Sequence, residues 1–309
     1  MNQATIKIRN YQPADFHKYV LFHAEVEKLE PSGRCVSPQF VAEQLRQPNY
    51  LPEQDLFIVE IDNDIVGYMD VKPELTIGRV VLDYRVHPEH RRRGLATKLL
   101  NNATNRAKEL GTTVAHVNIR EDNVVARRVL SRLGFSLVRR FLELRLDVGY
   151  VGGLDIDPAA TGCCYLQPGE EDKLTQLQNR AFTGTWGYNP NTVEEITFRI
   201  NSSTCSRKDI VLIYEGDKAI GYCWTGISCE EGIPSIRKGR ILMLGVAPDY
   251  RGKGISKKLV LAGLAHLKSK GLRIAELTVD SENIAACALY QSFGFEVQAN
   301  TLWYEKVIN

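Results

Sequence analysis

Two stretches of the chain combine small and basic residues at the spacing of an anion-binding turn. The first reads RRRGLATKLL from Arg91, and the second reads RGKGISKKLV from Arg251. Glycine lets the backbone approach a ligand closely, and the first turn of a helix presents unpaired N–H groups with about half a positive charge. Such a turn fits a pyrophosphate, although a solvated basic turn has the same composition. Both stretches are therefore candidate phosphate-binding sites.

A repeat at an offset of 160 residues joins these two stretches. Gly94 corresponds to Gly254, and the residues around them follow the same offset. Further pairs at this offset are Val86 and Val246, Pro88 and Pro248, Asn123 and Asn283, and Phe135 and Phe295. The unit is far longer than a solenoid repeat, so the 309 residues are expected to hold one domain twice. We expect an N-terminal domain at 1–147, a Gly-, Asp- and Pro-containing linker at 148–161, and a C-terminal domain at 162–309.

Strand and helix patterns follow the same order in both copies. Apolar runs predict strands at 5–9, 56–61, 65–71, 79–86, 114–119 and 138–146, and in the second copy at 210–214, 219–227, 240–246, 274–279 and 301–307. Helices are predicted at 95–110, 124–133, 171–182, 193–201, 256–270 and 284–293, and after Pro13 and Ser37. This order predicts an α/β (α+β) fold with a mixed central sheet in each copy. Each basic turn then lies between the fourth strand and the next helix.

Composition and charge exclude several classes of function. The chain is 44% hydrophobic and 25% charged, as in ordinary globular proteins, and its formal net charge of +2 predicts no nucleic-acid partner. No apolar run approaches the roughly 20 residues that cross a bilayer, so we expect no membrane partner and a cytoplasmic location. The seven cysteines form no C-x-x-C pair and are expected to be reduced, buried thiols. We expect no metal site.

The motifs resemble the GNAT superfamily of acyl-CoA N-acyltransferases over nearly the whole chain. The resemblance rests on Val-x-Pro followed by Arg91-x-x-Gly94-x-Ala96 in the first copy and by Arg251-x-x-Gly254-x-Ser256 in the second. An N-x-x-A-x-x-x-Y-x-x-x-G-F pattern is complete in the second copy, as Asn283, Ala286, Tyr290, Gly294 and Phe295. Ser256 departs mildly from the usual Gly or Ala. In length and duplicated layout, the chain is similar to the mycothiol synthase-like tandem members.

The resemblance implies acetyl-CoA as co-substrate, bound between splayed fourth and fifth strands with its pyrophosphate on the basic turn. In the second copy, the implied CoA-binding residues are Leu244, Val246, Arg251, Gly252, Lys253, Gly254, Ile255, Ser256 and Asn283. In the first copy, they are Tyr84, Val86, Arg91, Arg92, Arg93, Gly94, Leu95, Ala96 and Asn123.

The copies differ at the position of the general acid that, in the superfamily, reprotonates the leaving CoA thiolate. The second copy has Tyr290 there, and the first has Leu130. A thiol with a pKa of about 8.5 is already a fair leaving group, so losing this acid slows transfer without forbidding it. A packed core aromatic is the alternative role for Tyr290. We predict that the C-terminal domain is catalytic and that the N-terminal domain is degenerate.

The general base is less evident. In this superfamily, N-terminal acetyltransferases of ribosomal proteins carry a Glu five residues before the Asn, where this chain has Thr278 and, in the first copy, Asn118. Glu276 lies two residues before Thr278 and is the nearest substitute, with Glu230 and Glu231 as alternatives. The simpler role of each of these glutamates is a solvated charge. Because a lysine amine has a pKa of about 10.4 and an α-amine one of about 7.8, the missing base favours a low-pKa amine or a water relay.

The segment RAFTGTWGYNPNT at 180–192 lies where the superfamily binds the acceptor. Phe182, Trp186 and Tyr188, together with Trp303 near the start of the last strand, are expected to line a small-molecule pocket under the loop 229–238. A packed corner between two helices is the alternative.

The sequence thus predicts an N-acetyltransferase that moves acetyl from acetyl-CoA to the primary amine of a small molecule, by direct attack in a ternary complex in the C-terminal domain. We expect a monomer or homodimer. Two alternatives remain: a CoA-binding sensor or interaction protein without turnover, and a protein N-terminal acetyltransferase.

Overall fold

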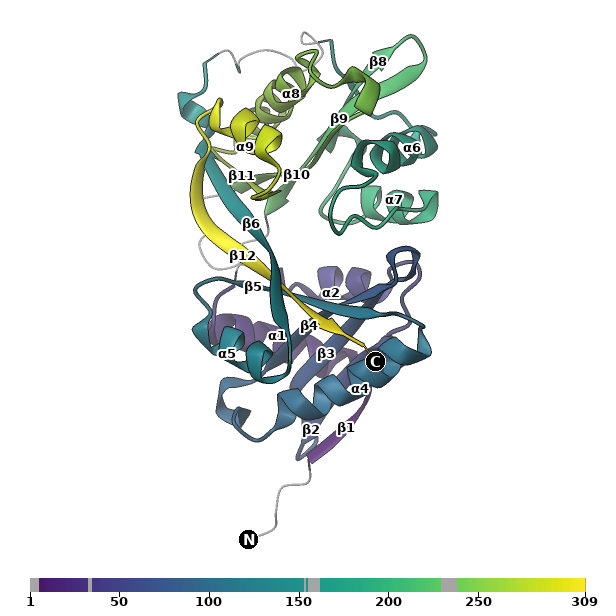
Figure 1. Cartoon of the computed structure of the whole chain (residues 1–309), viewed down its shortest axis with the longest axis vertical. Helices are drawn as coiled ribbons and strands as arrows, with labels where there is room; N and C mark the ends of the chain where they lie inside the picture. The colour runs from purple at the N-terminus through teal and green to yellow at the C-terminus, as the bar shows by residue number, and fades with distance from the viewer. Residues whose placement is uncertain (1–5, 33–34, 153, 155–161, 229–237, 309) are drawn as a thin grey trace. The chain divides into compact units, whose positions relative to one another are not determined.

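The computed structural model describes residues 6–32, 35–152, 154, 162–228 and 238–308 (Figure 1). The chain forms two compact units. Unit 1 comprises Met1–Arg139 and Thr301–Asn309, and unit 2 comprises Arg140–Asn300.

Unit 1 contains the predicted mixed sheet, and helices cover both of its faces. Its strands lie in the order β1-β2-β3-β4-β5-β12. The strands are β1 (Ile6–Asn10), β2 (Leu56–Ile61), β3 (Asp64–Glu74), β4 (Arg79–Val86), β5 (Val114–Arg120) and the end of β12 (Glu296–Val307). The helices are α1 (Phe16–Leu29), α2 (Pro38–Leu45), α3 (Pro52–Asp55), α4 (Leu95–Glu109) and α5 (Val124–Arg132). The helix predicted after Ser37 is present as α2, and Ser37 is its N-cap, since its hydroxyl accepts a hydrogen bond from the Phe40 N–H at 3.3 Å.

Unit 2 repeats this architecture. Its strands lie in the order β6-β11-β10-β9-β8-β7. They are β6 (Ser136–Asp147), β7 (Cys164–Tyr165), β8 (Ile210–Glu215), β9 (Lys218–Ser228), β10 (Lys238–Val246) and β11 (Ile274–Asp280). The helices are α6 (Glu171–Phe182), α7 (Val193–Ile200), α8 (Ile255–Ser269) and α9 (Ile284–Gln291). The predicted mixed-sheet fold, present twice, is confirmed.

The last strand of each copy pairs in the unit built from the other copy. Residues Phe141–Asp147 of β6 pair antiparallel with β11, and Thr301–Val307 of β12 pair antiparallel with β5. Figure 1 shows the yellow β12 beside β5 and the teal β6 beside β11. The contiguous boundaries 1–147 and 162–309 describe the repeat in the sequence, whereas the compact units have exchanged their last strands. Of the expected linker, Val148–Tyr150 form a single 3-10 turn and Leu154 is buried; 153 and 155–161 lie outside the described residues.

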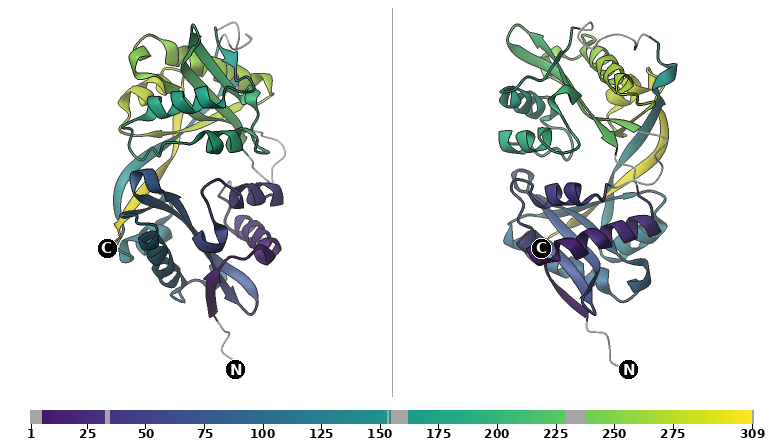
Figure 2. Two further views of the ribbon diagram at one scale, coloured as in Figure 1. Left: turned by 90° about the vertical axis from the view of Figure 1, so that its right-hand side faces the viewer. Right: turned by 180° about the vertical axis from the view of Figure 1, so that it is seen from behind.

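Each sheet is covered on both faces, which explains why its central strands are apolar at consecutive positions. In β2, Phe57 and Val59 face the core under α4 and α5, while Leu56 and Ile58 face the core under α1 and α2. Figure 2 shows the purple α1 and the blue α4 on opposite faces of the unit 1 sheet. In unit 2, α8 and α9 cover one face, and α6 and α7 cover the other.

Two expectations about the surface can be compared with the described residues. No helix among them is long and apolar enough to span a membrane. Six described cysteines are free; Cys163 and Cys223 are buried, but Cys164 is exposed, so the expectation of uniformly buried thiols is wrong for Cys164. It lies in the short edge strand β7.

Candidate functional site

The fourth and fifth strands of unit 2 separate, as the resemblance implies. Parallel pairing of β10 with β11 extends from Lys238 and Ile274 to Ile241 and Leu277. Beyond Ile241, β10 continues to Val246 with pairing to β9 alone, and the register shifts between Ile241 and Met243. This stretch of β10 contains the predicted residues Leu244 and Val246. Its edge toward β11 therefore has no strand partner among the described residues. Backbone groups at such an edge are suited to pairing with an amide-containing ligand.

Unit 1 has the same separation. Parallel pairing of β4 with β5 ends at Val81 and His116, five residues before the end of β4. Tyr84 and Val86 lie on the stretch of β4 that pairs with β3 but no longer with β5. The Tyr84 hydroxyl is buried without a hydrogen-bond partner among the described residues, and burial raises the pKa of Tyr84 to about 12.

The basic turn of unit 2 leads into an uncapped helix. Gly252 and Gly254 adopt the left-handed conformation, with φ of 76° and 77°, and Gly254 is the N-cap of α8 without a side-chain hydrogen bond. A Cβ added to either glycine would meet no atom of the described residues within 4 Å. The first N–H groups of α8, at Ile255 and Ser256, thus face an open turn, which fits a pyrophosphate.

The turn of unit 1 has the same backbone. Gly94 is the uncapped N-cap of α4 with φ of 73°, and Leu95 and Ala96 form its first turn. Arg92 has φ of 62° at the position of Gly252. A left-handed conformation costs a non-glycine residue roughly 1 kcal/mol, so unit 1 retains the turn against its intrinsic preference.

The first arginine of each turn is engaged with protein groups. Arg251 donates to the Val246 carbonyl at 3.3 Å and to the Ala181 carbonyl at 2.7 Å. Arg91 donates to the Val86 carbonyl at 3.1 Å and forms an ion pair with Glu30. Both guanidinium groups therefore fasten the turn to the end of the fourth strand, which differs from the direct phosphate contact that we expected.

The remaining basic residues of the turns are exposed. These are Lys253 in unit 2 and Arg92 and Arg93 in unit 1. The Lys253 ammonium lies 4.9 Å from the centroid of the Tyr250 ring. These three residues remain the predicted cationic contacts of a bound pyrophosphate.

Asn283 and Asn123 have a local structural role. The Asn283 side chain accepts a hydrogen bond from the Ala286 N–H at 3.1 Å, and Asn123 accepts one from the Ala126 N–H at 2.9 Å. Each is thus the N-cap of the helix that follows the fifth strand. These capping hydrogen bonds account for the presence of both asparagines without any ligand. A contact of either residue with CoA stays a prediction.

Tyr290 is the predicted general acid. It is only 7% exposed, and its ring packs edge-to-face on Phe295 at 5.7 Å. Burial raises the pKa of Tyr290, so the phenol is protonated at neutral pH and able to donate a proton. The structure shows no hydrogen bond from this hydroxyl to another described residue. Leu130, its counterpart, is 1% exposed in the apolar core of unit 1.

The structure does not favour Glu276 as the base. Its carboxylate pairs with Arg145 at 3.3 Å and with Lys238 at 3.5 Å. It also lies opposite Arg240, before the two strands separate. The alternatives Glu230 and Glu231 lie outside the described residues, as do 229–237 of the loop expected to close over the acceptor.

The exchanged strand supplies a carboxylate that the sequence analysis missed. Glu143 of β6 lies directly opposite Thr278, the first β11 residue beyond the paired segment. The adjoining Leu277 and Leu144 face the core under α8 and α9, so Thr278 and Glu143 lie on the face that α6 and α7 cover. The repeat offset places Glu143 at the position of Trp303, but only the strand exchange brings it into unit 2.

The predicted acceptor residues are divided between the units. In unit 2, Phe182 stacks on Tyr188 at 5.2 Å, and Trp186 lies 6.0 Å from the Phe141 ring. Tyr188 also donates a hydrogen bond to Asn179 at 2.8 Å.

Placing Trp303 in the C-terminal acceptor pocket was wrong. It lies in unit 1, paired with Asn118, and the Arg79 guanidinium stands 5.8 Å from its ring centroid. The cause is the exchange of β12.

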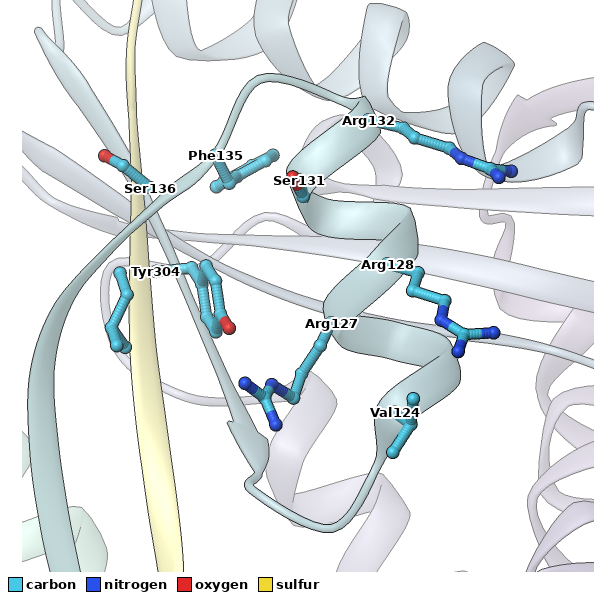
Figure 3. A pocket seen from close by; sticks show the side chains of 9 residues that line it. Val124, Arg127, Arg128, Ser131, Arg132, Phe135, Ser136 and Tyr304 are labelled. Atoms are coloured by element: carbon cyan, nitrogen blue, oxygen red, sulfur yellow. The ribbon is translucent and has the colours of Figure 1, made fainter.

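A second basic cluster, also missed, lies beside α5 in unit 1. It surrounds a cavity of about 700 Å³, lined by Val124, Arg127, Arg128, Ser131, Arg132, Phe135, Ser136, Leu137 and Tyr304 (Figure 3). Figure 3 shows Arg127 on the Tyr304 side of the helix, and Arg128 and Arg132 on its other side. The corresponding positions of α9 carry no charge, and the run ARRVLSR was the available signal. The described residues hold no group of three or more His, Cys, Asp or Glu suited to a metal.

Comparisons with known proteins agree with this geometry. The model of the acetyltransferase (GNAT) family matches residues 23–135 and 172–295. The mycothiol acetyltransferase of Amycolatopsis mediterranei is 31% identical over 76% of this chain and 78% of its own length. That of Corynebacterium efficiens is 28% identical over 99% of this chain and 98% of its own length.

Solved structures support the tandem fold. A GCN5-related N-acetyltransferase from Sphaerobacter thermophilus has a TM-score of 0.71 and 23% identity, covering 98% of this chain and 96% of its own. A tandem GNAT protein from the clavulanic acid biosynthesis pathway also has a TM-score of 0.71, with 15% identity and 99% coverage of both chains. The chain therefore belongs to the acetyltransferase (GNAT) family, as a tandem acyl-CoA N-acyltransferase similar to the mycothiol acetyltransferases.

Proposed function

We propose that unit 2 transfers an acetyl group from acetyl-CoA to the primary amine of a small molecule by direct attack in a ternary complex. The observation that carries the proposal is the joint presence in unit 2 of the strand separation, the open turn at Gly254 and the protonated hydroxyl of Tyr290. Unit 1 keeps the first two features, but has Leu130 in place of the hydroxyl.

The reaction needs one proton donor and one proton acceptor. The amine nitrogen bonds to the thioester carbonyl carbon, the carbon–sulfur bond breaks, and Tyr290 protonates the departing thiolate. Holding amine and thioester together supplies a large part of the rate, since orienting two reactants is worth about 7 to 11 kcal/mol. The amine proton leaves on the opposite side.

Glu143 is the proposed acceptor of that proton. The resemblance implies a base at the position of Thr278. Glu143 lies directly opposite Thr278 on the neighbouring strand β6, where β10 and β11 begin to separate. A carboxylate is a weak base, so it serves best with an amine of low pKa or through a water.

The acceptor is proposed to be a small molecule. The similar proteins are named mycothiol acetyltransferases, and the stacked Phe182 and Tyr188 give this face an aromatic surface. Aromatic surfaces next to a few polar groups are typical of small-molecule sites.

A panel of amines tests the proposed function. The full chain is incubated with acetyl-CoA and small alkylamines, amino acids, aminoglycosides or peptide N-termini. Acetylated product is measured by mass spectrometry, which avoids a thiol reagent in the presence of the exposed Cys164. We expect acetylated product with at least one small amine. Acetyl-CoA binding without any acetylated amine would favour the sensor alternative, and activity confined to peptides would favour the N-terminal acetyltransferase.

Two matched variants test the base. Glu143→Gln should lower kcat/KM at least tenfold at pH 7 with a smaller loss at high pH, where the free amine no longer needs a base. Glu276→Gln makes the same change on the paired part of β11. If Glu276→Gln lost more activity, Glu276 would be the base.

A further inference from the structure

The cavity beside α5 in unit 1 is lined by three arginines that have no acidic partner. Arg127, Arg128 and Arg132 are exposed, and none of them forms an ion pair with a carboxylate of the described residues. Of the described residues that line the cavity, none is acidic. By contrast, Arg106 on the neighbouring helix α4 pairs with Asp55 at 2.8 Å. The cavity therefore holds three positive charges that the protein does not neutralise.

The fold of the helix does not require these arginines. At the repeat offset, α9 carries Cys287, Ala288 and Ser292 in their places, and it forms from the same asparagine cap as α5. Arg128 and Arg132 also stand one helical turn apart, and like charges at this spacing destabilise a helix. Unit 1 thus carries an arrangement that costs stability and that its copy in the same chain lacks.

The helix dipole does not account for the arginines either. A cation is favourable at the C-terminal end of a helix, but Lys306 of β12 already donates a hydrogen bond to the Leu133 carbonyl there, at 2.5 Å. Arg127 and Arg128 lie in the middle of α5 (Val124–Arg132), where the dipole gives no such gain.

The arginine face of α5 points away from the apolar core. Leu130, at the position of the predicted general acid, is buried in that core. At 3.6 residues per turn, the helix residues that line the cavity lie about 60° to 200° around the helix from Leu130. Figure 3 shows Arg127 and Arg128 on opposite sides of the helix, which also contributes Val124 and Ser131 to the cavity. The cavity is therefore distinct from the place where an acyl group would react.

The lining chemistry suits a small molecule with several phosphate groups. A guanidinium presents paired N–H groups that match phosphate oxygens, and the hydroxyls of Ser131 and Ser136 add further donors. Val124 and Leu137, which are 49% and 50% exposed, offer apolar contacts for the body of the ligand. The volume of about 700 Å³ is within the range of small-molecule sites. A nucleic acid would instead require a basic stripe that extends beyond one short helix.

We propose that the cavity beside α5 binds a small organic polyphosphate, such as a nucleoside triphosphate, independently of acetyl-CoA. The three arginines contact the phosphate groups, and Val124 and Leu137 contact the organic body. This inference goes beyond the proposed function and does not depend on acetyl transfer.

Calorimetry on the full chain tests the inference. ATP, without divalent cations, is titrated into protein saturated with acetyl-CoA, so that the CoA sites of both units are occupied. We expect one ATP bound per chain, with an affinity that falls as salt is added because the contacts are between charges. Tripolyphosphate should bind within about tenfold of ATP, and adenosine should bind at least tenfold more weakly than tripolyphosphate, since charged hydrogen bonds supply most of the affinity.

Arginine variants assign the site. Arg127→Gln, Arg128→Gln and Arg132→Gln should each weaken ATP roughly tenfold, the usual effect of losing a hydrogen bond between charged groups. The matched control is Arg120→Gln, which removes an equal charge just before α5 from an exposed arginine paired with Asp122 at 2.8 Å, and it should stay within about twofold of wild type. ATP should raise the melting temperature of wild type and of Arg120→Gln, but not that of an Arg128→Gln/Arg132→Gln double variant.

Three results would overturn the inference. They are the absence of ATP binding to the acetyl-CoA-saturated chain, displacement of ATP by acetyl-CoA, and equal ATP affinity in wild type and all three α5 variants. The double variant should keep the melting temperature of wild type without ligand, because both side chains are exposed, so a lost response to ATP reports on binding rather than folding. A chain that binds ATP in this way but acetylates no amine of the panel contradicts the proposed function alone.

Discussion

The two units keep the same backbone around the fourth strand but differ in its side chains. Both have a strand separation and an uncapped helix behind a left-handed turn. On the face covered by the first two helices of each copy, unit 1 holds Tyr68, Asp83 and Arg85 in hydrogen bonds, where unit 2 has Tyr222, Met243 and Gly245. Hydrogen-bonded polar side chains occupy this face in unit 1, whereas in unit 2 the Tyr222 ring packs over Gly245 beside Ala181 and Phe182.

This difference separates two tasks of the fold. A pyrophosphate is held largely by backbone N–H groups, so a turn can persist while its sequence drifts, as Arg92 in the place of Gly252 illustrates. Acceptor binding and proton transfer depend on particular side chains, and there the copies have diverged. The comparison supports a catalytic unit 2 and a unit 1 that retains a CoA-binding shape.

The largest expected effect comes from a carboxylate placed on the turn of unit 2. Gly254→Asp sets a negative charge at the N-terminus of α8, in a conformation with φ of 77° that side chains rarely adopt. We expect acetyl-CoA affinity, measured by calorimetry, to fall at least a hundredfold, and turnover to fall with it.

The matched change in unit 1 is Gly94→Asp. Its backbone is the same, so a comparable loss of stability is expected, but turnover should stay within about twofold of wild type. If Gly94→Asp abolished acetyl transfer while Gly254→Asp did not, the assignment of the catalytic unit would be reversed.

A smaller effect is expected from the general acid. Tyr290→Phe keeps the packing on Phe295 and should lower kcat by about tenfold to a hundredfold, with little change in acetyl-CoA affinity. This loss is at or below the usual contribution of a proton donor, because a thiolate is already a fair leaving group. Leu130→Ala should act on stability alone, by about 2 to 5 kcal/mol for a buried leucine. An unchanged kcat in Tyr290→Phe would leave the tyrosine as a core aromatic.

The two units should also respond to acid in opposite directions. Burial raises the pKa of Asp70 in unit 1 to about 6, from an ordinary value of 3.8, despite the attraction of Lys72. The unfolded chain then loses this proton at a lower pH than the folded chain, so the stability of unit 1 falls as pH rises from about 4 to 6. Asp70→Asn should remove that slope and gain about 1 to 3 kcal/mol at pH 7.5.

Asp209 of unit 2 provides the contrast. Burial alone raises the pKa of Asp209, but hydrogen bonds from His266, Lys270 and Ser206 outweigh it and lower that pKa. Its contribution to stability is present above about pH 4 and is lost as pH falls further. Hydrogen-exchange protection at pH 3, 5 and 7.5 checks the difference: β2 and β3 should lose protection between pH 5 and 7.5, and β8 and β9 should lose it between pH 5 and 3. Equal changes in both units over both intervals would contradict the prediction.

The local sequence was sufficient to predict most of the helices and strands, the repeat and the two basic turns, but not the short α3 and β7. Glycines at 94 and 254 and apolar runs such as 56–61 have direct structural meaning, because left-handed turns and doubly covered strands restrict residue type. The roles of Arg91 and Arg251 were not predictable, because backbone carbonyl partners such as Ala181 leave no sequence pattern.

The exchange of the last strands was beyond local reasoning. Either copy of the strand satisfies the same alternation, so Glu143 and Trp303 are equally suited in sequence to either sheet. The outcome depends on pairing between residues more than 130 positions apart, such as Thr278 with Glu143 and Trp303 with Asn118. The proposed base therefore came only from the structure.

The smallest expected effect concerns the two tryptophans once assigned to one pocket. Trp186 packs against Phe141 in unit 2, beside the stacked Phe182 and Tyr188, while Trp303 packs against His116 in unit 1. Trp186→Ala should raise the acceptor KM about threefold to tenfold, since one aromatic contact is worth about 1 kcal/mol, and should leave acetyl-CoA affinity nearly unchanged. Trp303→Ala should leave both constants near their wild-type values and lower only the melting temperature. Steady-state kinetics with the best amine of the panel measure both constants. A larger acceptor KM for Trp303→Ala than for Trp186→Ala would place the acceptor surface on the exchanged strand of unit 1. Weakened acetyl-CoA binding in Trp186→Ala would assign its segment to the cofactor side.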